Sequence, residues 1–441
     1  MAKPIFNIQP TFQYYPEAYK NGVTYSQIPN LDAQDFVKSD TASARYRMNK
    51  DGVYENICSS GTSMPRLDYK LNSKGNPAPC PDLFVEKSKT NYLPFSVDLN
   101  GGPWASSGVS RVSDVGISPE GLQTCDVIKA SGAAGFHYVE AQISGVNNGM
   151  YVWSCFVKEQ RRQWIKLYMD NDGGGAPADP SDVFFNLGTG EAGDKSGSIV
   201  DSGIEKYPNG WFRVWMRWEK TGPTNQIKVR LYIADGASAG DDNFTGQNYD
   251  DIWYWGGQVE DDYLHSYIPT PAAVSVTNPD EHYETTGTSG LFNRWAGMMF
   301  ADFSIENQIV GSASTFSICD GSNNNGIYVS QQAGLPFNMN FSIKAGGVSQ
   351  MFHSEVIDSF GRYKIAVSWS DTNKYLAYIN GVMVKEDLFG SPFVNELTQC
   401  CLHNGSNVND FEGRFHDWRV YPNPNAVQDD IKEFLQSITT I

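Results

Sequence analysis

Three segments in the middle of the chain alternate apolar and polar residues with a period of two. Residues 163–170 read QWIKLYMD, residues 211–218 read WFRVWMRW, and residues 226–235 read QIKVRLYIAD. Because successive side chains of a β-strand point to opposite faces, each segment predicts a strand with one apolar face and one mixed face. Turns rich in glycine and asparagine lie between the segments. Short antiparallel strands of this kind are typical of a β-sandwich of the jelly-roll type.

The apolar faces of these strands predict the core of that sandwich. The residues expected to point inward are Ile165, Leu167, Met169, Phe212, Val214, Met216, Trp218, Ile227, Val229, Leu231 and Ile233.

The last third of the chain predicts a second sandwich. Residues 362–386 alternate through Ile365, Val367 and Trp369, and Asn380-Gly381 is a type I′ hairpin signal because both residues tolerate a positive φ. Residues 426–438 place Val427, Ile431, Phe434, Leu435 and Ile438 in one stripe, which predicts a short C-terminal helix.

The expected fold is therefore all-β, with two antiparallel sandwiches in series. The boundaries are an irregular N-terminal region at 1–87, a jelly-roll sandwich at 88–270, a linker at 271–290 and the second sandwich with its helix at 291–441. The N-terminal region contains one hairpin signal, around Asn21-Gly22. A region with so little core of its own is expected to pack on something larger.

Composition and charge narrow the possible partners. The net charge is −17 and the basic residues are not clustered, which argues against a nucleic-acid partner. No apolar run reaches the length of a membrane span, so no membrane insertion is expected. The N-terminal residues have no apolar run of signal-peptide length, so we expect synthesis and assembly in the cytoplasm.

Metal sites have little support in the sequence. The seven cysteines contain no C-x-x-C pair, so we expect buried small residues, with no structural zinc. Three segments rich in oxygen ligands, 170–175, 234–243 and 319–326, are either polar turns or loops that bind Ca²⁺. No cofactor is expected beyond such an ion.

Catalytic patterns are also missing from the places where the fold would put them. The second sandwich lacks the E-x-D-x-x-E of glucanases on this kind of fold, and no H-E-x-x-H occurs. We therefore expect that the protein is not an enzyme.

Several short motifs between residues 41 and 104 resemble the entry region of a class of tailed-bacteriophage virion proteins, mostly tail-associated or fibre-like. The matching pieces occur in the same order: Thr41–Arg45, Asn49–Gly52–Glu55, Pro65–Tyr69, Leu83–Glu86, Thr90–Asn91, Ser96 and Trp104. Residues 152–160, 207–218 and 252–270 resemble the carbohydrate-binding-like sandwich of that class. Residues 362–386 and 411–425 resemble laminin-G or concanavalin-like lectin sandwiches.

The resemblance implies a virion protein that is held by other virion proteins through its N-terminal region and that meets a host-surface glycan. It also implies a homo-oligomer, and fibre-like members of the class are often trimers. A purely structural head-decoration, collar or fibre protein with no sugar ligand is the alternative.

The candidate glycan site is the mixed outer face of the first sandwich. Sugars need aromatic rings for their apolar faces and planar polar side chains for their hydroxyls. If the strands are neighbours, the outer face offers both, through Trp164, Tyr168, Arg213, Trp215, Arg217, Arg230 and Tyr232. The same stripe would also suit an interface between protomers, because Trp, Tyr and Arg are enriched there.

Overall fold

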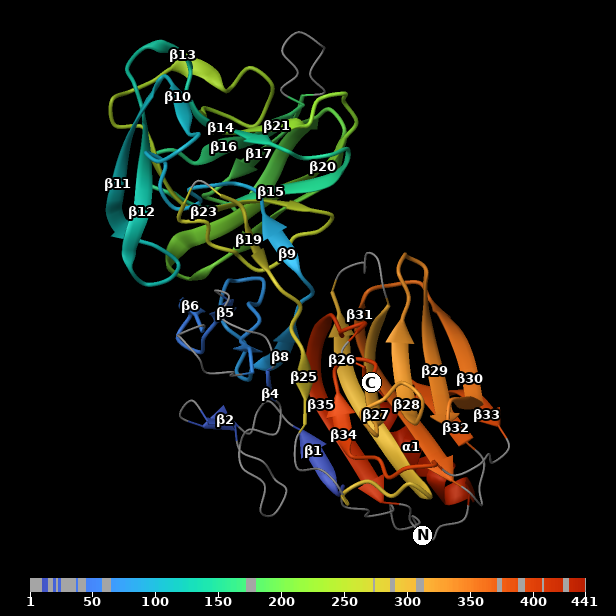
Figure 1. Ribbon diagram of the computed structural model, residues 1–441. Coiled ribbons are helices and arrows are strands. Elements are labelled where there is room, and N and C mark those ends of the chain that lie inside the picture. Colours follow the sequence, from blue (N-terminus) through green and yellow to red (C-terminus); the bar gives the residue numbers. More distant parts are fainter. Residues whose placement is uncertain are drawn as a thin grey trace.

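The computed structural model describes residues 10–14, 19–20, 23–24, 37–38, 45–57, 65–171, 180–272, 274–285, 290–306, 313–370, 375–387, 393–406, 408–422 and 428–440. The protein is all-β, with two antiparallel sandwiches, short N-terminal strands and a C-terminal helix (Figure 1). The predicted fold class is confirmed. Among the described residues, no helix has both the length and the apolar character that crossing a membrane requires.

The first sandwich consists of two six-stranded sheets. One sheet holds, in spatial order, β10 (Ala105–Ser107), β14 (Tyr138–Ser144), β21 (Gln226–Ala234), β16 (Trp164–Asp170), β17 (Ser181–Asn186) and β18 (Glu191–Ser196). The other holds β11 (Val109–Ile117), β12 (Gln123–Ala130), β23 (Asp251–Asp261), β15 (Gly149–Glu159), β20 (Trp211–Lys220) and β19 (Ile199–Lys206). All the inward-facing residues predicted from the alternation are buried between these sheets.

The second sandwich pairs an eight-stranded sheet with a seven-stranded sheet. The larger sheet holds β33 (Val382–Asp387), β32 (Tyr375–Ile379), β31 (Gly361–Ser370), β26 (Ala296–Ile305), β35 (Gly413–Pro422), β8 (Asp82–Val85) and β7 (Leu67–Asp68), and β1 (Phe12–Tyr14) also pairs with β35. The smaller sheet holds β30 (Val348–Ile357), β29 (Phe337–Ala345), β28 (Gly326–Gln331), β27 (Ser314–Cys319), β34 (Gln399–Cys401), β25 (Tyr283–Glu284) and β4 (Val37–Lys38).

Two local predictions for this sandwich are confirmed. Asn380 and Gly381 have φ values of 47° and 81° and join β32 to β33, as a type I′ turn requires. The helix α1 (Gln428–Thr439) packs Ile431, Phe434 and Leu435 on the outer side of the eight-stranded sheet.

Apart from one two-stranded hairpin, the described strands of residues 1–87 are divided between the two sandwiches, which differs from the separate region expected from the sequence (Figure 1). The hairpin of β5 (Tyr46–Met48) and β6 (Tyr54–Asn56) covers the outer side of the first sandwich, where its tyrosines pack with Phe156, Trp211 and Trp255. β1, β4, β7 and β8 extend the sheets of the second sandwich. Strands this short have no core of their own, so they complete the edges of larger sheets.

The predicted hairpin is confirmed as β2 (Tyr19–Lys20) pairing with β3 (Val23–Thr24), and its turn lies outside the described residues.

The segment expected to be a linker, 271–290, also carries strands. β24 (Val276–Asn278) pairs with β9 (Lys89–Asn91), and β25 lies inside the seven-stranded sheet. The segment lacks period-two alternation because each strand is very short, so the sequence pattern missed both.

Buried ion pairs join these segments where the two sandwiches meet. Arg66 is fully buried, with Nη1 2.8 Å from Glu86 Oε2 and Nη2 2.5 Å from Glu281 Oε2. Glu86 also accepts a hydrogen bond from the backbone N–H of Ser266, which follows β23. The N-terminal region and the entry to the second sandwich therefore share one group of charges, to which Ser266 at the end of the first sandwich is hydrogen-bonded.

We expect Arg66→Met to destabilise the protein by about 3–5 kcal/mol, because it leaves two buried carboxylates without their cation. The measurement is the free energy of unfolding in urea. Lys385→Met is the matched control: its ion pair with Asp387 is partly exposed, so its loss should cost about 1 kcal/mol or less. Equal effects of the two variants would contradict a structural role for the buried group.

Candidate ligand-binding cleft

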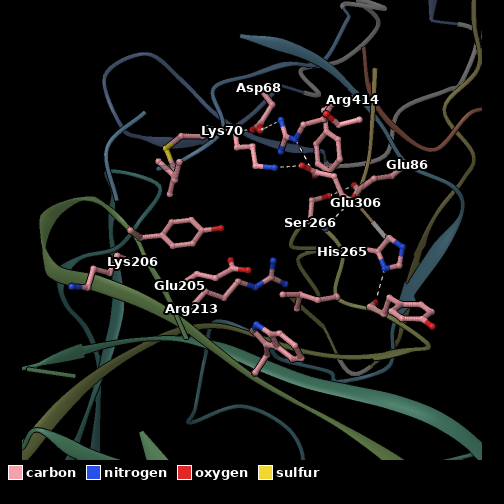
Figure 2. A pocket seen from close by; sticks show the side chains of 18 of the residues that line it. Asp68, Lys70, Glu86, Glu205, Lys206, Arg213, His265, Ser266, Glu306 and Arg414 are labelled. Atoms are coloured by element: carbon pink, nitrogen blue, oxygen red, sulfur yellow. Dashed lines mark hydrogen bonds and ion pairs between the residues drawn. The ribbon is translucent and has the colours of Figure 1, made fainter. Parts of the chain in front are cut away.

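A cleft of about 1080 Å³ lies between the two sandwiches (Figure 2). One wall is formed by β19, β20 and residues 263–266 of the first sandwich, and the opposite wall by residues 304–306, 360–362 and Arg414 of the second. Residues 68–73 of the N-terminal region complete the lining.

Three of the seven candidate residues line this cleft: Arg213, Trp215 and Arg217. They are alternate residues of β20, and the residues between them point into the core. The period-two pattern therefore places two guanidinium groups on either side of one indole, on the same face of the strand.

Trp215 is held in place by a glycine on the neighbouring strand. Gly203 of β19 is its cross-strand partner. A Cβ atom at Gly203 would lie 2.7 Å from Cε2 and Nε1 of Trp215, so the indole packs against the bare backbone there. The indole is half-buried, and part of it remains open to the cleft.

The two arginines differ in how their donors are used. Arg217 donates a 2.6 Å hydrogen bond from Nε to the carbonyl of Asp262, and its guanidinium lies 4.1 Å from the ring centre of Tyr263. Arg213 is only 4% exposed and donates from Nη2 to Ser154 Oγ at 3.2 Å. Its Nε has no hydrogen-bond partner.

Two carboxylates in the cleft have opposite electrostatic surroundings. Glu205 of β19 has an exposed side chain, yet the surrounding protein desolvates its carboxyl and raises the pKa. The charge of Arg213 lowers this pKa and the charge of Glu306 raises it, and the net shift is upward. Burial would raise the pKa of Glu306 too, but the nearby Arg414 and Lys70 hold it below its ordinary value. Arg414 Nε lies 3.0 Å from Glu306, and Arg414 Nη1 lies 2.7 Å from Asp68 (Figure 2).

The other four candidate residues lie on the opposite side of the first sandwich, on the outer face of the sheet that contains β16 and β21. Trp164 and Tyr168 are on β16, and Arg230 and Tyr232 are on β21. These strands pair directly, with Tyr168 opposite Arg230.

Side chains of this outer face bond to one another. Arg230 donates to Glu140 at 2.7 Å and to the hydroxyl of Tyr232 at 3.2 Å, and its guanidinium lies 4.9 Å from the ring centre of Tyr168. Lys166 pairs with Asp242 and lies over the ring of Tyr232. Burial raises the pKa of Tyr232 to about 12.

The seven candidate residues therefore form two separate groups on opposite faces of the sandwich. The sequence pattern showed which side of each strand they occupy, but not that β20 belongs to a different sheet from β16 and β21. Binding of a glycan by either group remains a prediction. Gly203, Glu205 and Arg414 were missed because nothing local in the sequence distinguishes them.

The described oxygen-rich segments are turns that use their own polar groups. In residues 234–243, the backbone N–H of Ser238 donates to the carboxylate of Asp241. In residues 319–326, Asp320 accepts from the N–H and hydroxyl of Ser322. Most of residues 170–175 lies outside the described part of the chain.

The turn at 234–243 also contains Gly-Ala-Ser-Ala-Gly at positions 236–240, the spacing of a nucleophile elbow. The expectation from the sequence that the protein is not an enzyme did not take this pattern into account. A nucleophile elbow joins a strand to a helix, whereas these residues join β21 to β22 (Asn243–Thr245) through turns. The structure therefore gives Ser238 the setting of an ordinary turn.

One group of side chains in the second sandwich brings three possible metal ligands close together. Ligand atoms of Glu284, Cys401 and His403 lie within 4.8 Å of one another, and the thiols of Cys319 and Cys401 are 3.8 Å apart. Burial lowers the pKa of His403 to about 4, so the ring is neutral. Because His403 Nδ1 accepts the N–H of Gly405, the ring proton lies on Nε2, the nitrogen nearer Glu284. A protonated nitrogen is not a ligand, which argues against a site built on His403.

Comparisons with known proteins give only weak likenesses. No family model matches the chain, and no curated protein matches its sequence. Among solved structures, Ruminococcus gnavus IT-sialidase CBM40 bound to alpha2,3 sialyllactose is 12% identical, with a TM-score of 0.26 over 33% of this chain and 83% of that chain. The leech intramolecular trans-sialidase is 14% identical, with a TM-score of 0.27 over 34% and 24%. A tail fiber protein from an E. coli phage is 8% identical, with a TM-score of 0.21 over 78% and 40%. These values identify neither a family nor a ligand for this chain.

His265 lies at the inner end of the cleft and takes part in the contacts between sandwiches. Its Nδ1 is 3.1 Å from Glu260 Oε2, and its Nε2 is 3.1 Å from Glu412 Oε1. Burial alone would lower the pKa of His265, but hydrogen bonds and charge from both glutamates raise it to about 10. The folded protein therefore holds an imidazolium that bridges the two sandwiches.

We expect His265 to make the stability of the protein depend on pH. Its folded pKa exceeds the unfolded value of 6.5, so the contribution is complete below pH 6.5 and is lost as the pH rises towards 10. The free-energy difference between the wild type and His265→Gln should shrink by up to about 1.4 kcal/mol per pH unit over that range. The measurement is urea unfolding of both proteins at each pH. A difference that stays constant would contradict a charged His265.

Proposed function

We propose that this protein is a glycan-binding component of a tailed-bacteriophage virion, fibre-like or tail-associated, and that saccharide binds in the cleft between its sandwiches. The observation that carries the binding proposal is the position of Trp215 between Arg213 and Arg217 on one wall of the cleft. An open indole suits the apolar face of a sugar ring, and guanidinium groups suit its oxygens.

The assignment to a virion rests on the sequence resemblance of residues 41–104. Attachment through the N-terminal region and host recognition through glycan belong to this proposal. A cleft on each copy of a homo-oligomer would let several weak sugar contacts act together, which raises the overall affinity without new contacts.

A purely structural role is the second candidate. Val348, Phe352 and Val356 form an exposed apolar row on the edge strand β30. Apolar rows of this kind suit contacts between subunits. A protein that binds no glycan and whose oligomer dissociates when Phe352 is replaced by serine would favour this role.

We expect Trp215→Ala to weaken binding to a glycan array by about tenfold or more, because it removes the aromatic contact with the sugar ring. Trp295→Ala is the matched control, since Trp295 is 45% exposed on the second sandwich outside the cleft. Trp164→Ala tests the opposite face of the first sandwich. Loss of binding in Trp164→Ala with retention in Trp215→Ala would place the glycan on that face and contradict the cleft.

Gly203→Val should also weaken binding while leaving Trp215 in the chain. A side chain at position 203 would displace the indole, because even a Cβ atom there is 2.7 Å from the ring. The array should show a loss comparable to that of Trp215→Ala, with the fold checked by circular dichroism. Gly132→Val is the matched control, because Gly132 has no positive φ and a Cβ atom there would come no closer than 3.5 Å to its nearest neighbour, Asn248. Full binding by Gly203→Val would mean that the indole position does not matter.

A further inference from the structure

Arg213 stands apart from the other buried arginines at the junction of the sandwiches. Arg66 faces two carboxylates and Arg414 faces three. Arg213 forms no ion pair within 4 Å among the described residues, although it is 4% exposed. Buried charges in folded proteins are normally paired, because an unpaired one is costly.

The donors of Arg213 are also incompletely used. A guanidinium group carries five N–H donors in a planar fork. Within the described part of the chain, only the bond from Nη2 to Ser154 Oγ is made, and Nε–H is unpartnered. Carboxylate, sulfate and phosphate groups match this fork, since their oxygens can accept two parallel hydrogen bonds.

The surroundings of Arg213 would tolerate such a group. Its cross-strand partner is Glu205, which lies beside it in the cleft (Figure 2). Desolvation raises the pKa of Glu205, the charge of Arg213 lowers it, and the charge of Glu306 raises it again, so that the pKa lies above its ordinary value. Glu205 therefore takes up a proton more readily than an ordinary glutamate, which reduces its repulsion of a nearby anion.

We infer that the saccharide taken by the cleft is acidic, and that Arg213 binds its oxyanion while the adjacent indole of Trp215 contacts the sugar ring. The inference rests on the proposed glycan function and adds the chemical class of the ligand. Arg217, already bonded to the carbonyl of Asp262 and stacked on Tyr263, would flank the ring on its other side.

The first test changes the ligand and leaves the protein intact. The array carries glycans with uronic acid, sulfate or phosphate groups, each beside its carboxyl-reduced, desulfated or dephosphorylated counterpart. We expect at least one acidic class to bind about tenfold more tightly than its neutral counterpart, the difference that charged hydrogen bonds make. The three arms identify which oxyanion is bound.

The second test changes Arg213. Arg213→Gln should bind an acidic glycan and its neutral counterpart equally, and Arg213→Lys should keep part of the preference, because it keeps the charge but loses the fork. Arg162→Gln is the matched control: Arg162 pairs with Asp235 and Asp250 on the first sandwich outside the cleft, so its loss should leave the preference unchanged. Melting curves check that each variant is folded. If Arg213→Gln does not fold, the acidic and neutral glycan pairs and the Arg213→Lys variant still test whether Arg213 binds an oxyanion.

The outcomes separate the two proposals. Equal binding of acidic and neutral counterparts, still abolished by Trp215→Ala, would overturn the acidic ligand and leave the glycan function standing. An acidic preference that Arg213→Gln does not alter would overturn the role of Arg213. Absence of any binding that depends on Trp215 would overturn both the glycan function and this inference.

Discussion

The buried guanidinium of Arg66 lies at the centre of the contacts where the two sandwiches meet. It pairs with Glu86 and Glu281 beside the second sandwich, and its Nη1 donates to the hydroxyl of Ser266 at the end of the first. Arg66 and Glu281 are 215 positions apart in the chain, and both are fully buried where their charged groups meet. A buried charge tolerates little movement of its partners, because lost geometry exposes the full desolvation cost. The ion pairs of Arg414 with Asp68 and Glu306 repeat this arrangement beside the cleft. The bonds of Ser266 to Glu86 and Arg66, and the contact of His265 with Glu412, reach from the end of the first sandwich to the second.

The residues that carry the sequence resemblance also have a physical role within this chain. Arg45, Arg66 and Glu86 belong to the buried group of charges. Ser96 hydrogen-bonds the hydroxyl of Tyr267 at 2.6 Å, and Asn91 donates to the carbonyl of Ile268 at 2.8 Å. These motif residues fasten the beginning of the chain to the end of the first sandwich. Their pattern in the sequence therefore reflects the construction of the junction at least as much as any contact with a partner.

Local features could be predicted from the sequence wherever a local rule decides them. The alternation around Ile165 and Val229 gave the core face, and Asn380-Gly381 gave a hairpin, because side-chain period and φ preference act within a few residues. The sheet to which a strand belongs depends on contacts far along the chain. For that reason Trp164 and Trp215 looked equivalent in the sequence, although they lie on opposite faces of one sandwich. The cleft itself, built from three regions of the chain, has no local signal at all.

The outer face and the cleft face of the first sandwich differ in how their cations are paired. On the outer face, Arg230 and Lys166 are each paired with a carboxylate and lie over aromatic rings of the same chain. On the cleft face, Arg213 is only 4% exposed and keeps an unused donor. A buried donor without an acceptor costs stability, so such donors are rare in folded proteins. Where one occurs, a functional requirement commonly explains it. The simplest such requirement is a ligand that supplies the missing acceptor to Arg213. The open indole of Trp215 lies beside the place where that ligand would bind.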